Sequence, residues 1–78
     1  MKKPRIVTDP RIMVGKPVVA GTRITVESIL ERLAAGETQE QILRAFPRLK
    51  MADIRAALTY AADELHAVVS YSMTNSAK

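Results

Sequence analysis

The chain is organised around Gly15-Lys16-Pro17-Val18-Val19-Ala20-Gly21-Thr22-Arg23-Ile24, a short apolar run that two glycines bound. Residues 17–20 are the clearest strand candidate, because they are rich in valine, too few for a helix and enclosed by proline and glycine. Proline cannot donate a hydrogen bond to a sheet, so this strand should begin at Pro17 or lie at an edge. The stretch therefore predicts a short β element.

A second short strand is expected at Arg5–Thr8, which is rich in β-branched residues and ends before the turn signal Asp9-Pro10. Residues 11–14 are either a further extended piece or part of a loop. An exposed strand edge is a template for pairing with another chain, so this element is expected to pair two copies in a dimer. The residues proposed for that interface are Ile6, Val7, Val18 and Val19. The alternative is an edge that residues 5–8 cover within one chain.

Two helices follow in quick succession. Thr25 caps the first and Gly36 ends it. Its apolar stripe consists of Val26, Ile29, Leu30, Leu33 and Ala34. Thr38 and Gln41 form a capping box at the start of the second helix, and Pro47 ends it. The buried face of the second helix is expected to consist of Ile42, Leu43 and Phe46.

The third helix is expected to be the longest and to begin after Lys50, a poor N-cap that Asp53 compensates in part. One side of it is apolar and consists of Ile54, Leu58, Ala61, Leu65 and Val68. Beyond Val68 the apolar residues alternate with a period of two, which predicts a strand-like or disordered tail. We therefore divide the chain into a helix-turn-helix domain with a β arm at residues 1–66 and a tail at residues 67–78.

Size and charge narrow the class of protein. A chain of 78 residues has a marginal core, because it buries only about 60% of its unfolded surface, and oligomerisation would stabilise it. The net charge is +4, and the basic residues gather at the N-terminal end. Before Ile24 the cations are Lys2, Lys3, Arg5, Arg11, Lys16 and Arg23, against Asp9 alone. Such an end suits nucleic acid or an acidic partner, and the alternative is an arm that only keeps the protein soluble.

Other functional classes find little support. No apolar run approaches the roughly 20 residues of a membrane span, and no apolar segment of a signal peptide follows the first cations, so a cytoplasmic protein is expected. Pro17 follows Gly15-Lys16 where a phosphate-binding loop needs serine or threonine. His66 has carboxylates nearby but no nucleophile, and no cluster has metal-ligand spacing. We expect neither an enzyme nor a cofactor.

Nucleic-acid binding fits the pattern better. Two helices joined by a short turn match a helix-turn-helix layout, in which the second helix of the pair enters the major groove of DNA. Arg55 is the candidate for reading guanine, and basic residues around the turn would hold phosphates. The predicted DNA contacts are Lys16, Arg23, Arg44, Arg48, Lys50, Met51, Ala52, Arg55 and Thr59. Asp53 counts against this hypothesis, because a carboxylate in the reading turn repels phosphates.

Three motifs carry a family resemblance. They are Ile6-Val7-Thr8-Asp9-Pro10, the stretch Gly15–Ile24, and Gly36 with Phe46-Pro47-Arg48-Leu49. Over roughly Ile6 to Glu64 the chain resembles family 433 of the domains of unknown function. The resemblance implies a homeodomain-like, trihelical DNA-binding domain of the VapB antitoxin type, with a PIN-like ribonuclease toxin as partner. Two positions depart from the family: Val14 stands where a second glycine is usual, and Lys50 where threonine or serine is favoured.

The leading hypothesis is an antitoxin of a type II toxin-antitoxin system, mainly α-helical, which binds operator DNA as a dimer. Its tail would order on the toxin, with Val69, Tyr71 and Met73 adding to a partner sheet. The alternative is a dimeric protein-interaction module that does not bind DNA.

Overall fold

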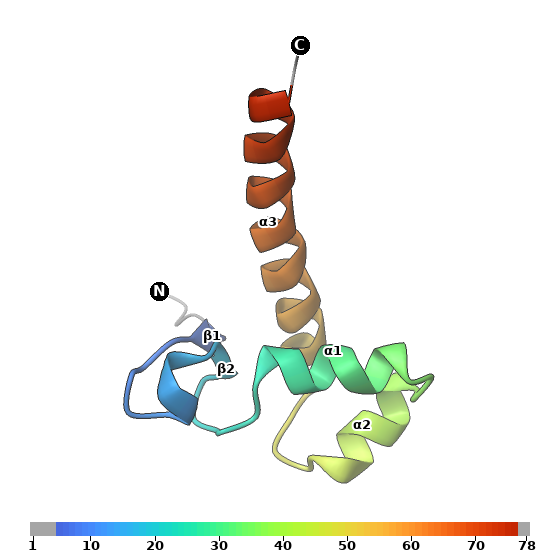
Figure 1. Ribbon diagram of the computed structural model, residues 1–78. Helices are drawn as coiled ribbons and strands as arrows, with labels where there is room; N and C mark the ends of the chain where they lie inside the picture. Colours follow the sequence, from blue (N-terminus) through green and yellow to red (C-terminus); the bar gives the residue numbers. More distant parts are fainter. Residues whose placement is uncertain (1–4, 77–78) are drawn as a thin grey trace.

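The computed structural model describes residues 5–76, and side chains for residues 5–68. Its elements are β1 (Ile6–Val7), the short turn η1 (Met13–Gly15), β2 (Val18–Val19), α1 (Val26–Ala34), α2 (Gln39–Ala45) and α3 (Met51–Ser76). The β strands, α1 and α2 form a base, from which α3 rises as a long rod (Figure 1). The predicted fold class, mainly α with three helices and a short N-terminal β element, is confirmed.

The β element is closed within one chain. β1 and β2 pair antiparallel, with Ile6 opposite Val19 and Val7 opposite Val18. On its other side, β2 forms a bridge between Val18 and Thr25, so it has a neighbour on both edges. The side chains of Val18 and Val19 are buried, 0% and 3% exposed. The expected open edge at β2 was therefore wrong, because residues 5–8 cover it from the same chain, and the two valines belong to the core.

The turn after β2 explains why Gly-Thr-Arg follows the valines. Gly21 has a φ of 80°, a left-handed conformation that glycine adopts without steric cost. The Thr22 hydroxyl donates to the Val19 carbonyl at 2.8 Å and accepts from the Ile24 amide at 3.0 Å. The turn thereby brings the chain back along β2 and delivers Thr25 to the start of α1.

The predicted ends of the first two helices are confirmed. The Thr25 hydroxyl accepts from the Ser28 amide at the start of α1. At its end Gly36 is left-handed, and the amides of Gly36 and Glu37 bond back into the helix in a Schellman arrangement. Thr38 and Gln41 form both halves of the capping box of α2.

The strand-like or disordered conformation expected after Val68 was wrong, because α3 continues as a helix to Ser76. Residues 51–78 contain no glycine or proline to stop it. Once a helix is nucleated, each further residue costs little, so a brief alternation of apolar residues does not end it. The proposed toxin contacts Val69, Tyr71 and Met73 lie on this helix, outside the residues whose side chains the structure describes.

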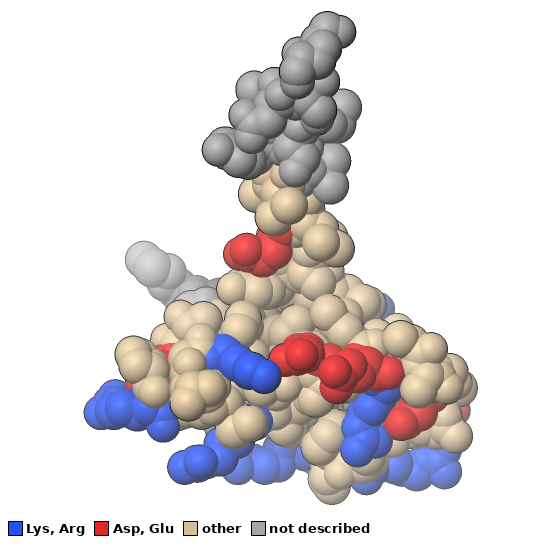
Figure 2. Space-filling view, in the orientation of Figure 1, with Lys and Arg blue, Asp and Glu red and all other residues tan. Residues whose placement is uncertain are grey.

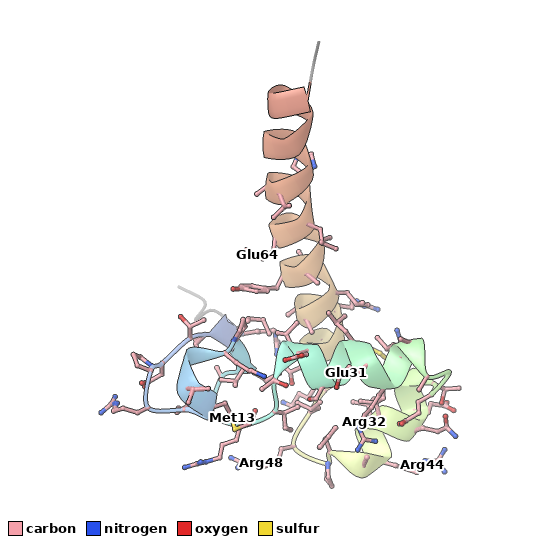
Figure 3. All side chains as sticks on the ribbon, viewed as in Figure 1. Met13, Glu31, Arg32, Arg44, Arg48 and Glu64 are labelled. Atoms are coloured by element: carbon pink, nitrogen blue, oxygen red, sulfur yellow. The ribbon has the colours of Figure 1, made fainter. Side chains whose placement is uncertain are left out.

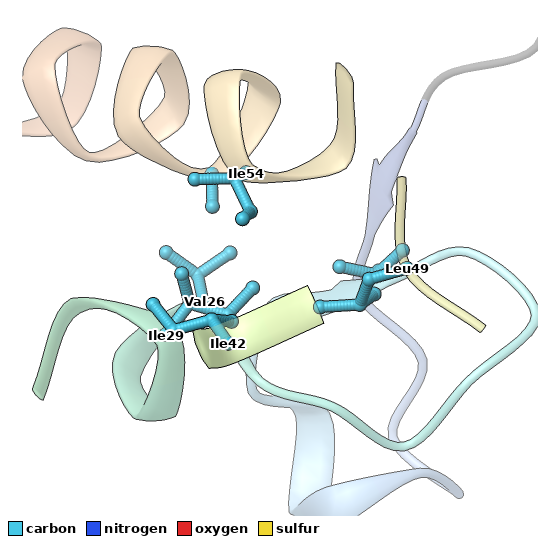
Figure 4. Packing of buried hydrophobic residues seen from close by; sticks show 7 residues of the cluster. Val26, Ile29, Ile42, Leu49 and Ile54 are labelled. Carbon is cyan, nitrogen blue, oxygen red and sulfur yellow. The ribbon is translucent and has the colours of Figure 1, made fainter. Parts of the chain in front are cut away.

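The core joins all three helices to β2. Ile29, Ile42 and Ile54, one from each helix, are each 0% exposed and meet at its centre (Figure 4). The buried cluster consists of Val19, Val26, Ile29, Ile42, Leu49, Ile54 and Ala57. Leu49 belongs to it although it lies in the turn between α2 and α3. That turn is therefore anchored, and the side chains on both sides of it are held at fixed places on the surface.

Candidate nucleic-acid interface

Basic side chains gather at one end of the molecule. Arg32, Arg44 and Arg48 lie along the side of the base opposite to the direction in which α3 rises (Figure 3). Lys and Arg dominate this lower edge in the space-filling view, whereas Asp and Glu form a band above it (Figure 2). Most of the positive charge thus lies below the negative charge on the surface that this view shows, although one basic side chain adjoins the band (Figure 2).

Ion pairing divides the cations into two groups. Among residues 5–68, whose side chains are described, four cations pair with carboxylates: Arg5 with Asp53, Arg11 with Asp9, Lys16 with Glu27 and Arg32 with Glu37. Five others in that range have no ion-pair partner and are exposed. They are Arg23, Arg44, Arg48, Lys50 and Arg55. All five belong to the set that the sequence predicted for DNA contact.

The structure brings two of these cations together from distant parts of the chain. Arg23 follows the turn after β2, and Arg48 lies in the turn between α2 and α3. Both line one hollow of about 580 Å³, together with Ile12 and Ile24. Neither guanidinium group forms an ion pair with a carboxylate among the described side chains. Two such groups at one hollow can bind a phosphate group.

The start of α3 presents the predicted reading face. Arg55 and Thr59, one turn apart, are exposed, whereas Met51 and Ala52 are half-buried. The turn before α3, Phe46–Lys50, is somewhat longer than the turn of about 3–4 residues in a typical helix-turn-helix. Of the four residues predicted to contact DNA from this part of α3, Arg55 and Thr59 are therefore more accessible to a ligand than Met51 and Ala52.

Asp53 does not face this surface. Its side chain is buried, and it accepts hydrogen bonds from the Lys50 amide and from Arg5, both at 2.9 Å. The bond to Lys50 is the returning half of a capping box, and it compensates in part for the acceptor that a lysine side chain cannot supply at the N-cap. The objection that Asp53 repels phosphates therefore falls away.

Lys16 lies apart from the other predicted contacts. Its ammonium group is 3.0 Å from Glu27 on α1. Glu27 lines a different surface depression, between α1 and α3, from the one that Arg23 and Arg48 line. An exposed pair of this kind is weak, but it places Lys16 beside the acidic band. Lys2 and Lys3 of the basic arm lie outside the described residues.

The family comparison agrees with the motifs. The family model described as "Protein of unknown function (DUF433)" matches residues 6–61, close to the expected range. The chain belongs to the DUF433 family. A curated relative, uncharacterized protein y4eO of Sinorhizobium fredii (strain NBRC 101917 / NGR234), is 41% identical over 56 residues, which are 72% of this chain and 25% of that protein. This chain thus spans about a quarter of that relative's length.

A solved structure shows the same fold. The crystal structure of a DUF433 member protein from Anabaena variabilis ATCC 29413 superposes with a TM-score of 0.78. It is 22% identical to this chain and matches 88% of this chain and 68% of its own. Among residues 5–76, no helix is long and apolar enough to cross a membrane.

Sequence reasoning missed one feature of the surface, an apolar groove between α1 and α3 that includes Leu30, Tyr60 and Leu65. A signal was present in the apolar side of the third helix. That side runs from Ile54 to Val68, farther than the two short helices before it can cover.

Proposed function

We propose that this DUF433 protein is the antitoxin of a type II toxin-antitoxin system, which binds operator DNA as a dimer and neutralises a PIN-like ribonuclease. The observation that carries the DNA-binding part is the distribution of exposed cations without an ion-pair partner among the described side chains. Four of the five lie close together in the chain. Arg44 is at the end of α2, Arg48 and Lys50 are in the turn, and Arg55 is in the second turn of α3. This is the part of a helix-turn-helix that contacts DNA.

The division of labour among these cations follows from their positions. Arg44, Arg48 and Lys50 flank the start of α3, where contacts to phosphates set the register of a protein on a duplex. Arg55 stands on the exposed face of the helix, and its fork can bond the O6 and N7 atoms of guanine together. Arg23 joins Arg48 at the hollow and extends the phosphate-binding surface toward the β element.

The toxin partner rests on the family resemblance. Members of this family often lie beside genes for PIN-like ribonucleases, and a protein with that role would act in the cytoplasm. A direct test is co-expression of this chain with a ribonuclease encoded beside it. We expect the chain to restore growth, and a version that lacks residues 69–78 to fail. Neutralisation by the shortened version would show that the tail is not the toxin contact.

Salt dependence tests the DNA-binding part. We expect the chain to bind DNA from upstream of its own gene, and to lose affinity as salt rises from about 50 to 200 mM, because phosphate contacts release counterions. With about four phosphate contacts per chain, the slope of log K against log salt should be near −4 for each chain bound. Fluorescence anisotropy with labelled duplexes measures it. A slope near zero, or no binding, would contradict the proposal.

One observation favours the alternative, a dimeric protein-interaction module that does not bind DNA. The groove between α1 and α3 is apolar and uncovered, which is typical of a protein-binding surface. Protein binding in this groove would not prevent DNA binding by the cations, because none of the five lines the groove. The salt titration therefore decides between the two functions, since only the DNA-binding protein shows a steep loss of affinity.

A further inference from the structure

The groove between α1 and α3 is not used by the DNA-binding proposal. It has a volume of about 480 Å³, and its floor includes Leu30 of α1 with Tyr60 and Leu65 of α3. Three carboxylates, Glu27, Glu31 and Glu64, form its rim. Glu31 and Glu64 lie on opposite sides of it, one on each helix (Figure 3).

The groove continues along the rod of α3. Leu65 is 63% exposed and Val68, one turn farther on, is 58% exposed. Ala61, Leu65 and Val68 follow the spacing i, i+4 and i+7 on one side of the helix. The apolar surface is therefore a strip along two helices that extends beyond the groove. A strip of this shape fits a rod-like partner.

Charge selects among possible partners. Glu31 and Glu64 have no ion-pair partner among the described side chains, and Glu27 has only the exposed Lys16. Residues 56–68 of α3 carry Asp63 and Glu64 but no lysine or arginine. The α3 of a second copy would therefore bring further negative charge to an acidic rim, which opposes association. A partner with positive charge on both sides of an apolar stripe is complementary.

We propose that this groove binds an amphipathic helix of a partner protein, with lysine or arginine flanking its apolar stripe. A helix laid between two helices buries its stripe through anchors at i, i+3, i+4 and i+7, which is the mode of helix-in-groove recognition. The cations of the partner helix would then pair with Glu31 on one side and with Glu64 on the other. The inference does not depend on the proposed function, because neither Arg48 nor Arg55 lines the groove.

The experiment uses the full chain and two synthetic helical peptides as probes. Each peptide has about 18 residues, enough for five turns, with leucine at the same stripe positions. Lysine fills the other positions of one peptide and glutamate those of its match. We expect the leucine-lysine peptide to bind at least tenfold more tightly in fluorescence anisotropy. Equal binding of the two peptides, or no binding, would overturn the proposal.

Variants locate the binding site. The double substitution Glu31→Gln with Glu64→Gln should weaken the leucine-lysine peptide roughly fivefold, and Leu65→Ser roughly tenfold. The matched controls are Glu40→Gln, an exposed carboxylate on α2, and Val14→Gly, at an exposed apolar residue that does not line the groove, and neither should change binding. Since Leu65 is exposed, its variant should fold, and circular dichroism checks this. If Leu65→Ser misfolds, the carboxylate pair alone decides.

A second copy is the occupant to exclude. Sedimentation equilibrium of the wild type and of Leu65→Ser compares their association. Loss of a dimer on substitution of Leu65 would show that the chain itself covers the groove and would overturn the proposal. Peptide binding that is insensitive to both groove variants would do so as well.

Discussion

Arg5 donates from Nη1 to Oδ1 of Asp53 at 2.9 Å and joins residues 48 positions apart. The other oxygen of Asp53 accepts from the Lys50 amide at 2.9 Å. One buried carboxylate thus caps α3 and ties the start of that helix to the residue just before β1. The β element therefore holds the start of α3, the part of the chain that is proposed to face DNA.

Replacing Asp53 with alanine should reduce the free energy of unfolding by about 1–3 kcal/mol, because both the cap and the ion pair are lost. Asp53→Asn keeps an acceptor for the Lys50 amide and should cost about half as much. Urea denaturation followed by circular dichroism measures both. Equal losses for the two variants would mean that the cap contributes nothing and that the charge alone matters.

Val14 lies in a conformation that its side chain disfavours. Its φ is 49° and its ψ 37°, a left-handed geometry, and its side chain is 88% exposed. Val14→Gly should raise the free energy of unfolding by about 1 kcal/mol, since glycine relieves the strain and no packing is lost. Val14→Ala, which removes the exposed methyl groups but keeps a Cβ, should change stability much less. A destabilised glycine variant in thermal denaturation would refute this explanation.

The pKa of Asp9 lies below its ordinary value of 3.8, mainly because Arg11 donates to the carboxylate from its side chain and also from its amide. Any stability that this pair adds is present above the ordinary pKa and is lost as the pH falls through the lowered one. Arg11→Ala should raise the pKa of Asp9 part of the way back, because the amide bond remains. NMR titration of the carboxyl carbon measures this, with Lys16→Ala as a control that should leave it unchanged.

Arg55 should carry sequence specificity. We expect Arg55→Ala to weaken binding to operator DNA by roughly 1–3 kcal/mol and to have little effect on random DNA. Anisotropy titrations of both duplexes give the two values. Equal losses would assign Arg55 to phosphates, and an unchanged affinity for both would move the reading surface away from α3.

Local signals in the sequence predicted the local structure well. Thr25, Thr38 with Gln41, Gly36 and Pro47 each act on the backbone within a few residues, and each produces the helix end that its chemistry favours. The apolar spacing likewise placed Ile29, Ile42 and Ile54 on inward faces.

Features that depend on contacts between residues far apart in the chain could not be predicted from local signals. The strand at Val18 and Val19 had two possible partners, and only the folded chain shows that β1 and Thr25 take both edges. The partner of Asp53 is 48 residues away, so the sequence could not show that its carboxylate turns inward. The short alternation after Val68 was too weak a signal to outweigh the continuation of a long helix.

The most direct test of the account compares Arg48→Ala with Lys16→Ala in salt titrations of binding to DNA from upstream of the gene. Arg48 has no ion-pair partner among the described side chains and shares a hollow with Arg23, whereas Lys16 pairs with Glu27 beside the acidic rim. We expect Arg48→Ala to reduce the magnitude of the slope of log K against log salt by about 1, and Lys16→Ala to leave the slope unchanged. An unchanged slope for Arg48→Ala, with a reduced one for Lys16→Ala, would contradict it.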